Sequence, residues 1–303
     1  MLILEKTNEG LLPDFIIVGA AKSGTTSLYH YISSHPNLYM SIPKEINFFS
    51  SQEINKQNLY YNYHSVDSLD EYKKYFQKAK NSSVIGEGSV SYLFYPSVPE
   101  RIKELLPDVK ILILLRSPVE RAFSHYLMDY RMGLINCSFE DVVYRRSTDK
   151  KINLFFQQYI ELGLYHDQVK RYLDVFGRER VKILLQEDLR NLKDKTMKDI
   201  FDFLDVDVSY EPDMSQEYNS FSMPKNAFVK KLYSSYFNRV LVGRLFSDTL
   251  KKKLKKILFQ IKVKPTIEPE TSFYLHRLYE KDIHNLEGLI ARDLSSWKKS
   301  RLL

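Results

Sequence analysis

The chain has 303 residues, 44% of them hydrophobic, which is enough to bury a large core in a single domain. Lysine and arginine number 45 against 38 aspartate and glutamate, and this net charge of +7 suits an anionic ligand, although no polybasic tail suggests nucleic acid. A single cysteine, Cys137, excludes an internal disulfide, and no stretch is long and uncharged enough to span a bilayer.

The first predicted unit is a strand, a glycine loop and a helix within residues 14–36. Phe15–Val18 is a short apolar run typical of a strand that is buried on both faces. Gly19–Gly24 is a loop of small residues, and a helical pattern then runs from Thr25 until Pro36 stops it. This geometry points free backbone N–H groups and the positive end of a helix at an anion. The unit is therefore predicted to bind a phosphate or a sulfate.

The position of the lysine in this loop separates two kinds of ligand. The Walker A pattern places lysine after the second glycine, whereas here Gly24 is followed by Thr25 and the lysine stands earlier, as Lys22. A nucleoside triphosphatase would lack the cation that reaches its β- and γ-phosphates. The stretch closely resembles the 5′-phosphosulfate loop of sulfotransferases that use 3′-phosphoadenosine 5′-phosphosulfate (PAPS). The resemblance implies a donor site made of Gly19, Ala21, Lys22, Ser23, Gly24, Thr25 and Thr26.

Within that family the loop looks most like the branch of the heparan sulfate sulfotransferases and their bacterial relatives. The resemblance implies a P-loop-like α/β fold, with a central parallel sheet flanked by helices. It implies one domain over residues 1–303, with a nucleotide-binding core over about 13–205 and a helical part over about 225–303. It also implies PAPS as donor, adenosine 3′,5′-bisphosphate as product and no required metal. Animal relatives carry an N-terminal anchor that this sequence lacks, so a cytoplasmic, bacterial protein is expected.

The segment Pro43–Phe49, PKEINFF, resembles the K-E-x-x-F-F element of the same branch, in which the glutamate is assigned as catalytic base. The resemblance implies that Glu45 takes the proton of the acceptor, because a sugar hydroxyl is a poor nucleophile until it is deprotonated. The alternative is that Lys44 and Glu45 form a solvated charge pair that opens a helix. Some relatives have histidine in place of Asn47 and an acid in place of Ser50, which leaves further acceptor contacts open.

A short strand that begins at Val84 runs into the sequence EGSVSY, residues 87–92. The relatives have E-K-[ST]-P-x-Y here, and their lysine is thought to contact the sulfonate. This chain has Gly88 and Val90 in place of that lysine and proline. The departure leaves Lys22 as the main positive charge that can stabilise the leaving group.

Residues 110–115 form another apolar run, with Arg116 at its carboxyl end. The sequence SPVE at 117–120 predicts a helix that begins with a capping box, and Ser124 lies about two turns from its start. The sequence RSPVERAFS resembles the R-x-P-x-x-R-x-x-S element of the sulfotransferases, so Arg116 and Ser124 are expected to hold the 3′-phosphate of PAPS. The alternative is an arginine paired with a nearby acid and a serine on a polar helix face.

Beyond Cys137 the pattern is mainly helical, with one more strand at Val181–Leu185 and a long amphipathic helix over 269–294. Four strand-like runs that alternate with helices predict a parallel sheet covered on both faces, and Leu38–Met40 fits a further short strand. Glu187 and Asp188 are interpreted as structural acids rather than catalytic ones.

Apolar residues between 245 and 261 recur at helical spacing, and seven lysines from Lys251 to Lys264 fill much of the other side. These lysines are interpreted as a solvated helix face. The alternatives are a groove for an acidic acceptor or a peripheral contact with an anionic membrane surface.

Taken with the resemblance, the sequence predicts a PAPS-dependent O-sulfotransferase whose acceptor hydroxyl belongs to a carbohydrate. Two other functions stay open: a nucleoside or nucleotide kinase that uses the same loop, and a non-catalytic module that binds an anionic glycan through the lysines at 251–264. His125 is the next candidate base if Glu45 does not serve.

Overall fold

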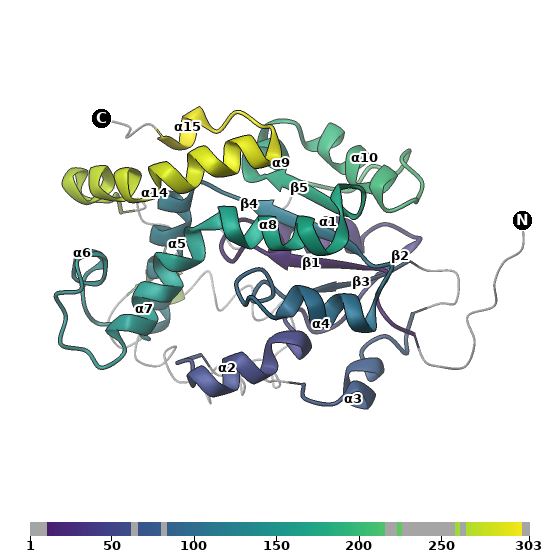
Figure 1. Cartoon of the computed structure of the whole chain (residues 1–303), viewed down its shortest axis with the longest axis horizontal. Coiled ribbons are helices and arrows are strands. Elements are labelled where there is room, and N and C mark those ends of the chain that lie inside the picture. The colour runs from purple at the N-terminus through teal and green to yellow at the C-terminus, as the bar shows by residue number, and fades with distance from the viewer. Residues whose placement is uncertain are drawn as a thin grey trace, which may run out of the picture.

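The computed structural model describes residues 11–61, 66–79, 84–215, 223–225, 258–260 and 265–298. Its centre is a five-stranded parallel sheet in the order β2-β3-β1-β4-β5 (Figure 1). In that order the strands are Leu38–Met40, Val84–Gly88, Phe15–Gly19, Lys110–Leu115 and Val181–Leu185. The predicted parallel sheet is confirmed, and the short run at 38–40 is its edge strand. A separate antiparallel pair joins β6 (Met223–Pro224) to β7 (Phe259–Gln260).

Helices cover both faces of the sheet, because the central strands β1 and β4 are apolar on both sides. One face buries Ile16 and Val18 under a cluster that includes α4 (Val98–Leu105), α5 (Pro118–Met132) and α8 (Tyr165–Phe176). The other face buries Phe15 and Ile17 under α1 (Thr25–Ser33), α9 (Gln186–Asn191) and α10 (Lys193–Phe203). The result is the predicted three-layer α/β fold.

The remaining short elements surround these layers. They are η1 (Phe48–Ser50), α2 (Ser51–Gln57), α3 (Leu69–Lys74), α6 (Phe139–Val143), α7 (Ile152–Tyr159), η2 (Glu161–Gly163) and η3 (Arg178–Arg180). No helix within the described ranges is long and apolar enough to cross a membrane. Most of the predicted basic helix, including every lysine from Lys251 to Lys264, lies outside the described residues; near its end, Phe259–Gln260 is strand β7 rather than helix.

The long helix α14 (Pro269–Ile290) and the short α15 (Ser295–Lys298) join the same core as the sheet (Figure 1). The Tyr279 hydroxyl donates to the carbonyl of Ile160 at 2.9 Å, and the Trp297 indole N–H donates to Oε1 of Glu187 at 2.8 Å. Glu187 thus has the structural role that its sequence context predicts. The proposed division of the chain into a core and a helical part stays a prediction.

The capping box predicted at the start of α5 is wrong. Ser117 is the N-cap residue and Pro118 opens the helix, but the Ser117 side chain makes no capping hydrogen bond. The Glu120 carboxylate pairs instead with the Arg116 guanidinium, with Nη2 and Oε2 2.9 Å apart. A nearby full charge attracts this carboxylate more strongly than a backbone N–H does.

Removing the Trp297 side chain should show how far the C-terminal helices stabilise the core. Trp297 is 2% exposed, so Trp297→Ala is expected to lower the free energy of unfolding by about 3–5 kcal/mol. Urea unfolding followed by circular dichroism measures this, since the variant has no tryptophan fluorescence. Phe273→Ala is the matched control: Phe273 lies on α14 but is 55% exposed, so a change within about 0.5 kcal/mol is expected. Equal losses in the two variants would contradict the packing described here.

Candidate active site

A cavity of about 530 Å³ opens at the carboxyl ends of β1, β3 and β4. Parallel strands end at the same edge of a sheet, which is where open α/β folds bind ligands. Lys22 and Arg116, which are 94 residues apart in the chain, meet here because β1 and β4, the strands that precede them, pair directly. Most of the predicted site residues line this cavity, namely Ala21, Lys22, Gly24, Thr25, Thr26, Glu45, Arg116 and Ser124.

Two of the predicted donor-site residues do not reach the cavity. Ser23 is fully buried, and its backbone N–H donates to the Ala20 carbonyl at 3.3 Å. Gly19 lies at the end of β1, where an added Cβ would approach Leu93 to 2.7 Å. Both residues determine the shape of the loop and do not line the cavity.

The loop that ends at Gly24 presents the start of α1 to the cavity. Gly24 is the N-cap residue with a φ of 101°, a left-handed conformation that glycine adopts without a steric penalty. Because glycine has no side chain to cap the helix, the first-turn amides at Thr25 and Thr26 remain available to a ligand. The local geometry is that of an anion site.

Lys22 carries the charge of this anion site. Its ammonium contacts the Met128 sulfur at 3.3 Å, and a thioether is a weak acceptor. Among the described residues, no carboxylate forms an ion pair with it. Burial, followed by the charge of Arg131, lowers the pKa of Lys22 to about 8, while the Asp129 carboxylate acts in the opposite direction. The ammonium therefore lacks the strong acceptor that a bound anion would supply.

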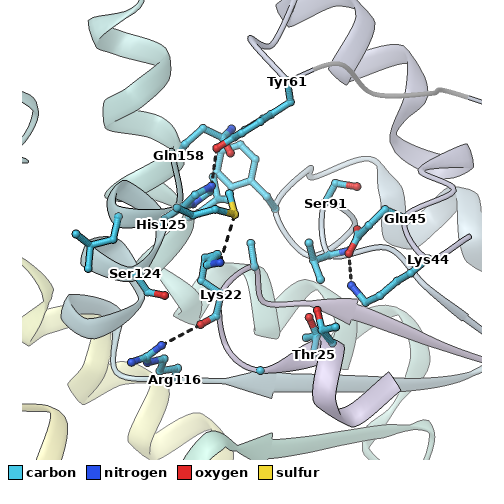
Figure 2. A pocket seen from close by; sticks show the side chains of 18 of the residues that line it. Lys22, Thr25, Lys44, Glu45, Tyr61, Ser91, Arg116, Ser124, His125 and Gln158 are labelled. Atoms are coloured by element: carbon cyan, nitrogen blue, oxygen red, sulfur yellow. Dashed lines mark hydrogen bonds and ion pairs between the residues drawn. The ribbon is translucent and has the colours of Figure 1, made fainter. Parts of the chain in front are cut away.

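Arg116 and Ser124 stand on the wall beside Lys22 (Figure 2). Arg116 Nη1 donates to the Lys22 carbonyl at 3.3 Å, so the guanidinium braces the loop from β4. The same guanidinium also pairs with Glu120, as the alternative interpretation of the sequence expected. Its side chain is 11% exposed and lines the cavity, so the ion pair with Glu120 orients it without removing it from the site.

Glu45 lies across the cavity from Lys22, on the turn between β2 and η1 (Figure 2). Its Oε2 accepts the Val90 N–H at 2.9 Å, and its Oε1 pairs with the Lys44 ammonium. Its own N–H donates to the Gly88 carbonyl at 2.8 Å. The expected charge pair of Lys44 and Glu45 is present, but it does not open a helix, since η1 begins only at Phe48.

The turn that carries Glu45 is held in place by hydrogen bonds that lead through Ser89 to Glu87. This carboxylate is fully buried and accepts three hydrogen bonds of 2.5–2.7 Å, from the hydroxyls of Tyr72, Ser89 and Tyr92. Burial raises the pKa of Glu87, and the three hydroxyls partly offset that effect. Ser89 Oγ in turn accepts the Asn47 N–H at 3.0 Å. A continuous chain of hydrogen bonds thus runs from the sheet to the turn.

A second buried cluster lies behind Lys22 and was not predicted. The Asp129 carboxylate accepts hydrogen bonds from three tyrosines, Tyr60, Tyr61 and Tyr159. Burial raises the pKa of Asp129 to about 6. In the sequence, the only sign of this cluster was the tyrosine-rich composition near residue 60, and no spacing rule links those tyrosines to Asp129.

His125, the second candidate base, belongs to this cluster. Its Nε2 lies 2.7 Å from the Tyr61 hydroxyl and its Nδ1 lies 3.3 Å from Arg121 Nη1. Burial, and then the charge of Arg121, holds the pKa of His125 well below its usual value. Both ring nitrogens have their partners within this buried cluster.

A sequence model of the sulfotransferase domain matches residues 12–287. The chain belongs to the sulfotransferase family. A crystal structure of a sulfotransferase from Alicyclobacillus acidocaldarius matches with a TM-score of 0.70 and 32% identity, over 95% of this chain and all of that one. The predicted family, enzyme class and α/β fold are thereby confirmed.

Two curated relatives resemble parts of this sulfotransferase. The human bifunctional heparan sulfate N-deacetylase/N-sulfotransferase 2 is 30% identical over 208 residues, which is 67% of this chain and 23% of that protein. The membrane-associated sulfotransferase kil1 of Dictyostelium discoideum is 36% identical over 118 residues, 38% of this chain and 22% of that protein. The matched segments thus span less than a quarter of either relative.

The lowered pKa of Lys22 gives the sulfotransferase a measurable signature. Lys22 should be protonated below pH 8 and neutral well above it, whereas an ordinary lysine titrates near pH 10.4. An NMR titration of the lysine side-chain Cε resonances measures the midpoint, with Lys22→Arg to assign the signal. A Lys22 midpoint above pH 10 would contradict the partly buried, weakly paired state described here.

Proposed function

We propose that this sulfotransferase moves the sulfonate group of PAPS to a hydroxyl of a carbohydrate acceptor. One observation carries the proposal: Lys22, Arg116 and Ser124 converge beside the start of α1, and the Glu45 carboxylate faces them across the same cavity. The cavity therefore offers cationic groups for a nucleotide with two anionic groups and a base for the acceptor.

The two halves of the nucleotide would occupy different parts of this wall. The first-turn amides of α1 and the Lys22 ammonium fit the phosphosulfate, because a helix start and a cation both favour negative charge. The forked donors of Arg116 and the hydroxyl of Ser124 fit a phosphate monoester such as the 3′-phosphate. Both sets of groups line one continuous cavity.

The transfer itself is a single displacement at sulfur. The acceptor oxygen forms a bond to sulfur while the bond from sulfur to the bridging oxygen of the phosphosulfate breaks. The electron pair of that bond goes to the leaving adenosine 3′,5′-bisphosphate, whose new charge Lys22 stabilises. Glu45 accepts the acceptor proton, and the product is a sulfate ester. The protein acts mainly by positioning and by electrostatics, as in phosphoryl transfer.

A carbohydrate acceptor is supported by the curated relatives rather than by a contact in the cavity. The human relative is named for the N-sulfation of heparan sulfate, so an amine acceptor is the comparison that the assays must include. Aromatic side chains of Tyr61, Phe94 and Tyr95 line the cavity and offer flat surfaces for a sugar ring. The expected cytoplasmic location and independence from metal stay predictions, and all assays are therefore run with and without EDTA.

The donor assignment predicts that the protein distinguishes the 3′-phosphate. Adenosine 3′,5′-bisphosphate should raise the melting temperature more than adenosine 5′-phosphate does, because binding stabilises the native state. Arg116→Ala should weaken bisphosphate binding by about tenfold or more, the contribution of a hydrogen bond to a charged group. Arg180→Ala, which removes an arginine paired with Asp108 outside the cavity, serves as the control. Equal affinity of the wild type for both nucleotides would overturn the assignment.

The role of Glu45 predicts a selective loss of turnover. Glu45→Gln keeps the size of the side chain but removes the basic oxygen, so kcat should fall by about 10²–10⁴-fold. Bisphosphate release from PAPS in the presence of saccharide and amino-sugar acceptors measures kcat. Affinity for the bisphosphate should stay near that of the wild type. Glu53→Gln is the matched control, since Glu53 pairs with Arg101 and does not line the cavity. Turnover within a few-fold of wild type would show that Glu45 is not the base.

A further inference from the structure

Lys44 reaches the cavity from the side opposite Lys22, and Thr25 at the start of α1 lies between the two (Figure 2). The Lys44 side chain is 16% exposed, and its ammonium pairs with Oε1 of Glu45. The transfer step described above uses the Glu45 carboxylate but leaves this ammonium without a role.

Gly88, at the end of β3, provides the space that the Lys44 side chain occupies. A Cβ placed on Gly88 would lie 3.6 Å from Lys44 Cε and 3.7 Å from Lys44 Cγ, with Tyr29 Cδ2 at 3.5 Å. These are ordinary contact distances, so the stem of the lysine rests directly over the glycine. A longer side chain at position 88 would grow into the volume that the lysine now fills.

The backbone of Glu45 turns its side chain toward the same wall as Lys44. Consecutive side chains in an extended chain point in opposite directions. Glu45 has a φ of 67°, in the left-handed region that non-glycine residues rarely adopt, and its N–H is fixed to the Gly88 carbonyl. Lys22 and Asn47, which also line the cavity, have positive φ values of 68° and 57°. Such conformations gather at functional sites, where the surrounding structure holds them.

We propose that Lys44 is a catalytic cation that binds the sulfonate oxygens of the donor and leaves Glu45 to do so. This inference rests on the proposed function. Before the donor binds, the ammonium occupies Oε1 of Glu45, so that this oxygen is not open to an acceptor hydroxyl. When the sulfonate arrives, its three oxygens compete for the ammonium, and the transfer of Lys44 to them exposes the carboxylate. One side-chain movement thus neutralises the sulfonate and frees the base.

The chemistry of lysine suits this exchange better than that of arginine would. Its ammonium is a compact charge with three donors on a flexible four-carbon stem, so it can change partner without a backbone movement. During transfer Lys44 keeps its protons: the acceptor proton goes to Glu45, and the electron pair of the broken sulfur–oxygen bond goes to the bisphosphate. The opposing interpretation is a fixed ion pair that only holds the turn, and partly exposed pairs of that kind contribute little.

The first test compares two nucleotides that differ only in the sulfonate. Lys44→Met keeps the length of the side chain and removes its charge. Affinity for PAPS should fall about 10- to 100-fold, the range that one charge-assisted hydrogen bond supports, while affinity for adenosine 3′,5′-bisphosphate should stay within about twofold. Titration calorimetry measures both without an acceptor. A loss that is equal for the two nucleotides, or no loss, would show a structural pair and overturn the proposal.

The second test moves the charge to the neighbouring strand. In the double variant Lys44→Ala/Gly88→Lys, a lysine from β3 extends into the vacated volume, and PAPS affinity and turnover should recover at least tenfold over Lys44→Ala. Lys44→Ala/Gly88→Met controls for bulk and should not recover. A failure of the lysine variant to exceed the methionine variant would refute a role for the ammonium.

Binding measurements on the wild type distinguish a failure of this proposal from a failure of the donor assignment on which it rests. Wild-type protein that binds neither nucleotide would refute the use of PAPS, and Lys44 with it. Wild-type protein that binds PAPS, together with a Lys44→Met variant that binds it equally well, would refute Lys44 alone.

Discussion

The site depends on the charge of Lys22, which is partly buried and, among the described residues, has only a sulfur atom as hydrogen-bond partner. A buried charge is costly unless it is paired, and here that cost appears as a lowered pKa rather than as an ion pair. The backbone keeps Lys22 in place in spite of this, through left-handed conformations at Lys22 and Gly24 and a contact from Arg116 to the Lys22 carbonyl. The loop is thus preorganised for an anion that completes it.

The sheet determines how the two halves of the site meet. β1 is the central strand, with β4 on one side and β3 on the other, and Ile17 pairs with Leu112 in one neighbour and Gly88 in the other. The carboxyl end of β4 brings Arg116 to the cavity wall beside Lys22, and that of β3 supports the turn that carries Glu45. The separation between these two sides of the cavity therefore depends on strand register, which is among the most rigid features of a protein.

Local patterns made part of this site predictable from the sequence. The glycine loop and Arg116 follow apolar strands directly, so their place at the sheet edge could be inferred. The capping box failed because Glu120 pairs with a charge that the pattern did not consider, and Ser23 faces the core because its amide closes a turn within the loop. The cluster around Asp129 could not be foreseen, since it joins residues 68 positions apart with no periodicity between them. The same holds for Lys44, whose place over Gly88 depends on the packing of a turn against a strand end.

The hydrogen bonds around Glu87 tie the Glu45 turn to residues that lie outside the cavity. The carboxylate gathers hydroxyls from α3 and from the segment after β3, and Ser89 relays its position to the Asn47 amide. A chimaera that exchanged the Glu45 turn with another sulfotransferase would therefore have to carry Tyr72, Ser89 and Tyr92 along with it. Selection on the Glu45 turn would consequently extend to residues such as Tyr72, which is fully buried and does not line the cavity.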